Sequence, residues 1–251
     1  RIALIIVAWS FLATPMVQAE TTATVINQDI TVNTTWTKAG SPYNVTQFIR
    51  VRPGVTLTVE PGVEVAFNLN TPMRVEGALI AQGTANEPIT FTGSTKQPGA
   101  WNGLLVGHLP EQPAVLKFDH VIVEYATYVG MEGGGNVELT YANAEIRNST
   151  FRFGGGNGLV VASAANATIA DSHFNNNTLQ ALRISYGAQS TLTLRNLAAS
   201  GNGTLNAVVY ASGNVAGTLG LNKMGLPYVF QGGFDVEKTG HLTIDPGVEI
   251  Q

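Results

Sequence analysis

A loose repeat of short apolar strands is the feature of this sequence that most limits its fold. Leu159 recurs as Leu182, 23 positions later, and Leu182 recurs as Val208 after a further 26 positions. The segment 146–151 reappears as 169–174, again 23 positions later. A unit this short cannot bury an apolar face by itself, so successive units must bury it jointly in a stack.

Alternation within the strands predicts which side chains line the shared interior. Successive residues of a strand point to opposite faces, so Leu159, Leu182 and Val208 should form one inward column, with Arg183 outward. Parallel strands need a connection that returns the chain to the starting edge, and a coil provides it without helices. We therefore predict an all-β, single-stranded parallel solenoid of about eight turns, roughly 40 Å long at ~4.8 Å per turn.

A second repeat has a much longer period. The segment 39–65 reappears as 224–250 at a constant offset of 185 positions, so that Pro61 matches Pro246. The sequence stops one residue after this second copy. We expect the chain to hold one full unit and the opening of the next, within a longer protein.

The N-terminus has the pattern of a secretory signal. Arg1 precedes an apolar run of about a dozen residues, which is followed by the small-x-small triplet Val17-Gln18-Ala19. The run is too short to span a bilayer comfortably. Because the first residue is Arg and not Met, the start of the gene product is expected to be missing.

Composition excludes several classes of protein. The chain has 13 Lys and Arg against 17 Asp and Glu, a net charge of −4, and no basic stripe that would suit nucleic acid. It has no cysteine, so an exported chain of this kind must be stabilised by packing and backbone hydrogen bonds and not by disulfides.

Polar residues recur near one place in the repeat, namely His120, Asn148, Asp171 and Asn196. At a tight bend such side chains hydrogen-bond the backbone, and their copies stack into a ladder. We prefer this structural role to a catalytic one for His120 and Asp171.

Three Thr-x-Thr pairs are expected on outward strand positions: Thr56 and Thr58, Thr90 and Thr92, and Thr191 and Thr193. The intervening turns lack Thr at the matching place, so an ice-binding array is not predicted.

Several of these motifs carry a family resemblance. They are the starting motif VTLTVEPGVEVAF (55–67), the second turn VEGALIAQGTANEPITFT (75–92), the turn Trp101-Asn102-Gly103 and the strand VEYA (123–126). Over roughly residues 36–251 the chain resembles the right-handed parallel β-helix proteins of the pectin-lyase-like superfamily, in particular secreted bacterial ones. The resemblance implies the fold but not one function, since the superfamily includes lyases, hydrolases and adhesins.

This resemblance and the repeats together predict the organisation of the chain. We expect a signal peptide over 1–19 and an N-terminal capping segment over 20–50. A parallel β-helix unit should follow over 51–220, and the start of a second, truncated unit over 221–251.

Enzymes of the superfamily imply residue sets that are not recognisable here. Its hydrolases carry clustered Asp residues with Gly-His-Gly and Arg-x-Lys motifs; the nearest approach, Arg183-Ile184-Ser185, lacks the lysine. Its lyases need a calcium-binding carboxylate cluster and an Arg or Lys base. The four histidines show no spacing typical of a zinc site. We predict no catalytic residue, no cofactor and no metal.

The candidate ligand-binding residues are aromatic and cationic. Trp101, Tyr125, Tyr128 and Tyr186 would offer rings on which sugars stack, and Arg183 would offer a charge. The alternative is that the rings pack under the loops.

We predict a secreted or cell-surface module with a structural or adhesive role, exported by a bacterium of the Gram-negative type. Its expected partner is an extracellular glycan or a surface protein. The alternative is a polysaccharide lyase or glycoside hydrolase whose active residues lie partly outside this chain.

We expect no nucleic-acid partner and, once the signal is removed, no membrane span. The sequence leaves the oligomeric state open.

Overall fold

A computed structural model describes residues 22–127, 133–162, 164–186 and 191–251. Within these residues the chain is built almost entirely from short strands, and the single helix is a 3₁₀ turn at Lys38–Gly40. None of the described helical residues forms a segment long and apolar enough to cross a membrane. The predicted signal peptide over 1–19 lies outside the described residues.

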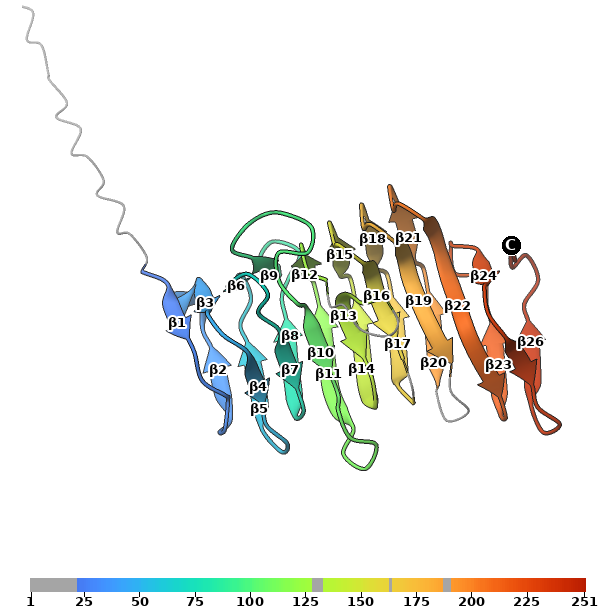
Figure 1. The fold of residues 1–251 in the computed structure, drawn as a ribbon, viewed down its shortest axis with the longest axis horizontal. Coiled ribbons are helices and arrows are strands. Elements are labelled where there is room, and N and C mark those ends of the chain that lie inside the picture. The colour runs from blue at the N-terminus through green and yellow to red at the C-terminus, as the bar shows by residue number, and fades with distance from the viewer. Residues whose placement is uncertain (1–21, 128–132, 163, 187–190) are drawn as a thin grey trace, which may run out of the picture.

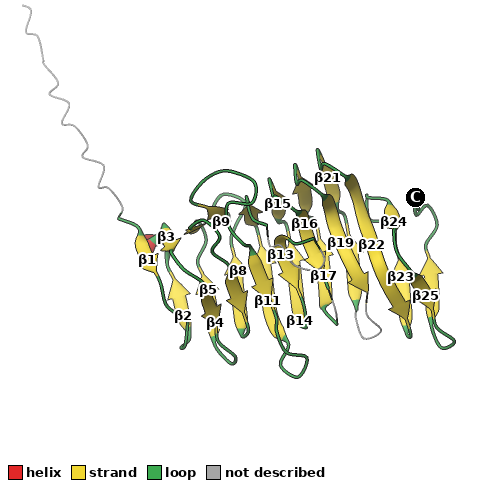
Figure 2. Cartoon of the chain, viewed as in Figure 1, coloured by secondary structure: helices red, strands yellow, loops and turns green. Residues whose placement is uncertain are grey.

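The strands form three long parallel sheets that run side by side along the molecule (Figures 1 and 2). Sheet A contains β1 (Thr24–Ile26), β3 (Tyr43–Val45), β6 (Glu64–Phe67), β9 (Ile89–Gly93), β12 (Val121–Glu124), β15 (Thr150–Arg152), β18 (His173–Asn175) and β21 (Ala198–Ser200). Sheet B contains β4 (Ile49–Val51), β7 (Met73–Val75), β10 (Leu104–Val106), β13 (Gly135–Leu139), β16 (Asn157–Val161), β19 (Gln180–Tyr186), β22 (Leu205–Val215), β24 (Tyr228–Phe230) and β25 (Phe234–Val236). Sheet C contains β2 (Thr34–Trp36), β5 (Thr56–Val59), β8 (Ala78–Gln82), β11 (Ala114–Asp119), β14 (Ala142–Arg147), β17 (Asn166–Ala170) and β20 (Leu192–Arg195). A fourth, two-stranded sheet pairs β23 (Thr218–Leu221) with β26 (His241–Ile244).

From β4 to β22 the chain visits sheets B, C and A in turn and then begins the next winding. Each strand therefore pairs in parallel with the strand one winding earlier, as β8 does with β5 and β11 does with β8. This is the coil that the short repeat predicted, and the predicted fold class is confirmed.

The interior is a set of aligned apolar columns. Leu159 pairs with Leu182, and Leu182 pairs with Val208; all three side chains are fully buried. Phe151 and Phe174 also pair, and their rings stack with centroids 5.3 Å apart. The predicted inward column is confirmed. Complete burial of one such side chain contributes about 1.5–3 kcal/mol, which lets a chain without disulfides hold together.

The bends between sheets C and A confirm the predicted positions of the recurring polar residues. His120, Asn148, Asp171 and Asn196 all have left-handed backbones, with φ between 47° and 51°, a conformation that Asn, Asp and His tolerate best after glycine. The ladder bonds run between side chains and not to the backbone: Asn148 donates to Asp119 at 2.8 Å and Asn196 to Asp171 at 2.7 Å.

The long repeat is also visible in the strands. β3, β4 and β5 of the first copy correspond, 185 positions later, to β24, β25 and β26. Ile30 bridges Val51 at the first predicted boundary, and across residue 220 sheet B continues because β22 pairs with β24. Within the described residues, sheet A ends at β21 and sheet C at β20, while β23 pairs with β26 in the separate fourth sheet.

Candidate functional site

A column of polar side chains crosses the outer face of sheet A. Because the strands pair in register, outward residues of successive windings stand next to one another. Glu124 pairs with Arg152, Arg152 with Asn175 and Asn175 with Ser200, while Thr92 reaches Glu124 from the preceding winding. These residues come from five different strands, and the sequence analysis did not identify them as a group.

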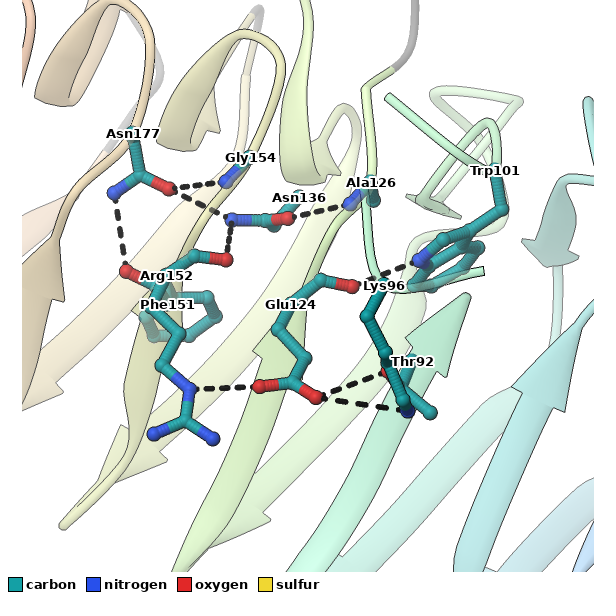
Figure 3. Close-up of polar contacts among 10 residues, drawn as sticks. All are labelled: Thr92, Lys96, Trp101, Glu124, Ala126, Asn136, Phe151, Arg152, Gly154 and Asn177. Carbon is teal, nitrogen blue, oxygen red and sulfur yellow. Dashed lines mark hydrogen bonds and ion pairs between the residues drawn. The ribbon is translucent and has the colours of Figure 1, made fainter. Parts of the chain in front are cut away.

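Glu124 is the centre of this column and is only 5% exposed. Its carboxylate accepts hydrogen bonds from the Arg152 Nε at 2.7 Å and from the Thr92 hydroxyl at 3.0 Å (Figure 3). The Lys96 Nζ donates to the Thr92 hydroxyl at 2.7 Å and lies 3.9 Å from the carboxylate. A buried charge is tolerated only when it is paired. Glu124 thus holds two cations whose outer ends remain at the surface.

An aromatic ledge lies directly beside this cluster. We define it as Tyr125 and Phe153, whose rings stack with centroids 5.4 Å apart, together with Lys96 and Arg152 above them. The Lys96 Nζ is 5.9 Å from the Tyr125 ring centroid, and the Arg152 Cζ is 5.4 Å from that of Phe153. Both residues are half-buried, so each keeps part of its surface open to solvent.

The backbone at the ledge is unusual for bulky residues. Tyr125 has a φ of 63° and Phe153 a φ of 53°, whereas such left-handed conformations favour Gly, Asn and Asp. A bulky side chain there costs about 1–3 kcal/mol, and strain of this kind clusters at functional sites. The ledge is therefore our candidate binding site.

Trp101 requires a correction. Its side chain is fully buried, stacks on Phe67 at a centroid distance of 4.0 Å, and donates its indole N–H to the Glu124 carbonyl at 2.9 Å (Figure 3). The prediction that this ring is available to a sugar is wrong, because core packing covers it. Trp101 instead supports the ledge from beneath.

The other predicted residues are not all brought together. Tyr125 lies in the ledge. Arg183 lies on β19 and pairs in register with Val160 and Val209 of sheet B, a different face of the coil. Tyr128 lies outside the described residues, as does the side chain of Tyr186.

A buried amide ladder fastens the chain next to the ledge. Asn136 accepts the Ala126 N–H at 3.0 Å and donates to Asn177 at 3.0 Å. Asn177 in turn donates to the Phe151 carbonyl at 3.0 Å (Figure 3). It also donates to Asn202 at 2.9 Å. A side chain at Gly154 would have its Cβ 2.8 Å from the Asn136 amide, so the ladder also requires glycine there.

The sequence analysis missed this ladder. The sequence pattern that could have indicated the ladder is the recurrence of Asn177 as Asn202, 25 positions later. The interval from Asn136 to Asn177 is 41 positions, which hides the third member.

Among the described residues, no three His, Asp or Glu side chains gather in a way that could hold a metal ion.

Comparison with known proteins agrees with this architecture. The family model described as "Right handed beta helix region" matches residues 77–223, which is more than half of the chain. The family model described as "Pectate-lyase like beta helix domain" matches residues 27–111. Neither the curated proteins nor the solved structures gave a match.

Proposed function

Because this chain belongs to the family of right-handed β-helix proteins, we propose that it is a secreted or cell-surface adhesive module that binds extracellular glycans. The binding site in this proposal is the aromatic ledge on the side of the coil. The solenoid provides a rigid support, and the ledge provides the contact.

One observation carries the proposal, namely the stacked and half-exposed Tyr125 and Phe153 rings beneath two cations. The C–H faces of sugar rings pack on aromatic faces, with the polar groups of the sugar directed outward. Lys96 and Arg152 are placed to donate charge-assisted hydrogen bonds to such groups.

The charges of the site favour a glycan with acidic groups. Two cations face a single carboxylate, and that carboxylate is engaged by Arg152 and Thr92. Glu124 therefore serves to position the cations, and the remaining positive charge attracts carboxylate or sulfate groups on the ligand.

The test is binding of the purified chain to a panel of neutral and acidic polysaccharides. We expect Tyr125→Ala and Phe153→Ala each to weaken binding about ten-fold, the effect of losing roughly 1.4 kcal/mol of stacking. Tyr141→Ala is the matched control, because Tyr141 is also half-buried with a left-handed φ of 50° but lies between β13 and β14. Equal affinity for all three variants would reject the ledge as the site.

The match to the pectate-lyase-like domain over 27–111 favours a second candidate, a polysaccharide lyase or glycoside hydrolase. Incubation of the chain with pectin, alginate and other polyuronates distinguishes the two. Release of unsaturated or reducing ends would replace the adhesive proposal with an enzymatic one.

A further inference from the structure

The outer face of sheet C is an array of straight columns of outward side chains. Pairing is in register from β5 to β20, so each column crosses six strands. The middle column reads Thr58, Ile80, Lys117, Glu145, Thr168 and Thr193. The next column, nearer the bend to sheet A, reads Glu60, Gln82, Asp119, Arg147, Ala170 and Arg195. A third column, from Thr56 to Thr191, carries no charge.

Four charged residues of this face remain available for an ion pair with another molecule, whereas Asp119 already accepts a hydrogen bond from Asn148 at 2.8 Å and lies 2.8 Å from the His120 Nδ1. Lys117 stands next to Glu145 on the adjacent strand. Among the described residues, however, neither they nor Arg147 and Arg195 form an ion pair within 4.0 Å. Glu145, Arg147 and Arg195 are exposed, and Lys117 is half-buried.

The order of residues along the columns is self-complementary. Consider a twofold axis that runs parallel to the strands between β11 and β14. It places β11 opposite β14 of a second copy, β8 opposite β17, and β5 opposite β20.

Every charge on the face then meets its opposite. Lys117 faces Glu145 of the partner subunit, Asp119 faces Arg147 of the partner subunit, and Glu60 faces Arg195 of the partner subunit. Each contact occurs twice because of the symmetry.

The Thr-x-Thr pairs obey the same symmetry. Thr56 and Thr58 lie on β5, and Thr191 and Thr193 lie at β20, so the two pairs face each other across the axis. Thr hydroxyls both donate and accept hydrogen bonds, which allows a threonine to face a threonine.

We propose that the outer face of sheet C is a homodimer interface in which two copies of this chain pack face to face about that axis. Six rows at ~4.8 Å and three columns span roughly 29 Å by 20 Å, so the dimer would bury about 1,100 Å² in total. This area lies near the lower limit for a specific interface. The association is therefore expected to be reversible and to depend on concentration.

Charge reversal tests the proposal by analytical ultracentrifugation over a concentration series. Wild type should sediment increasingly as a dimer as concentration rises. Lys117→Glu and Glu145→Lys should each weaken dimerisation at least about ten-fold, because each places like charges opposite one another at two points. Lys238→Glu is the matched control for Lys117→Glu, since it makes the same charge change at an exposed turn residue outside sheet C.

An equimolar mixture of the two variants is the decisive sample. In the mixed dimer, the introduced carboxylate at 117 faces the introduced ammonium at 145, and the native pair faces its native partner. Affinity should return to within about three-fold of wild type, roughly 0.6 kcal/mol. Within each chain the like-charged neighbours remain, so recovery can come only from contact between copies. A mixture as weak as the separate variants, or a wild type that stays monomeric at millimolar concentration, would overturn the proposal.

Discussion

Replacing Asn177 by alanine should reveal how much the buried amide ladder stabilises the coil. The Asn177 side chain is 1% exposed and makes four hydrogen bonds. Its oxygen accepts the Asn136 amide and the Gly154 N–H, both at 3.0 Å. Its nitrogen donates to the Phe151 carbonyl and to Asn202.

The expected cost follows from what each partner loses. The Gly154 N–H has no other acceptor among the described residues, and an orphaned buried donor costs about 1–3 kcal/mol. Loss of the bonds to Phe151 and Asn136 adds about 0.5–1.5 kcal/mol each. Asn136 keeps a longer contact with the Arg152 carbonyl at 3.4 Å, which limits its share. The free energy of unfolding should therefore fall by about 2–5 kcal/mol.

Urea denaturation followed by circular dichroism measures this loss. Asn166→Ala is the matched control, because Asn166 also belongs to an amide pair, with Asn143 at 3.1 Å, but is exposed; its loss should stay below about 1 kcal/mol. Each winding contacts only its neighbours, so hydrogen exchange in Asn177→Ala should accelerate mainly in β15, β18 and β21. If the two variants were equally stable, the ladder would not be an important source of stability.

Three further predictions concern the core and the support of the site. Leu182→Ala opens a cavity in a fully buried column and should cost about 3–5 kcal/mol in chemical denaturation; a loss under about 1 kcal/mol would argue against the aligned interior. Burial raises the pKa of Tyr228 to about 12 from 10.0, despite the opposing hydrogen bond to Asn222. The folded state favours the neutral phenol, so this contribution is complete below pH 10 and is lost as the pH rises to 12. Unfolding titrations across that window should show an extra loss of up to about 2.7 kcal/mol in wild type, and Tyr228→Phe should lack it; identical profiles would contradict the assignment. Trp101→Phe removes the indole bond to Glu124 and should cost about 1–3 kcal/mol of stability while changing glycan affinity less than Tyr125→Ala does; the reverse order would make Trp101 the sugar platform.

The sequence was sufficient to predict the coil because the repeat and the strand alternation are both local patterns. Each winding must place an apolar residue above that of the winding before it. In the sequence these residues recur as Leu159, Leu182 and Val208. The left-handed bends were equally readable, since few residue types tolerate that backbone conformation and Asn148 and Asn196 recur where it is needed.

The candidate site could not be predicted in the same way, because its members come from windings separated by loops of unequal length. Lys96 and Arg152 meet at Glu124 only after the chain has coiled, and no spacing in the sequence marks that meeting. The sequence also could not decide which aromatic side chains are buried. Trp101 and Tyr125 are both aromatic, yet Trp101 lies in the core and Tyr125 at the surface. Local patterns determine which face of a strand is apolar, whereas the stacking of distant windings determines which side chains are covered and which polar groups meet.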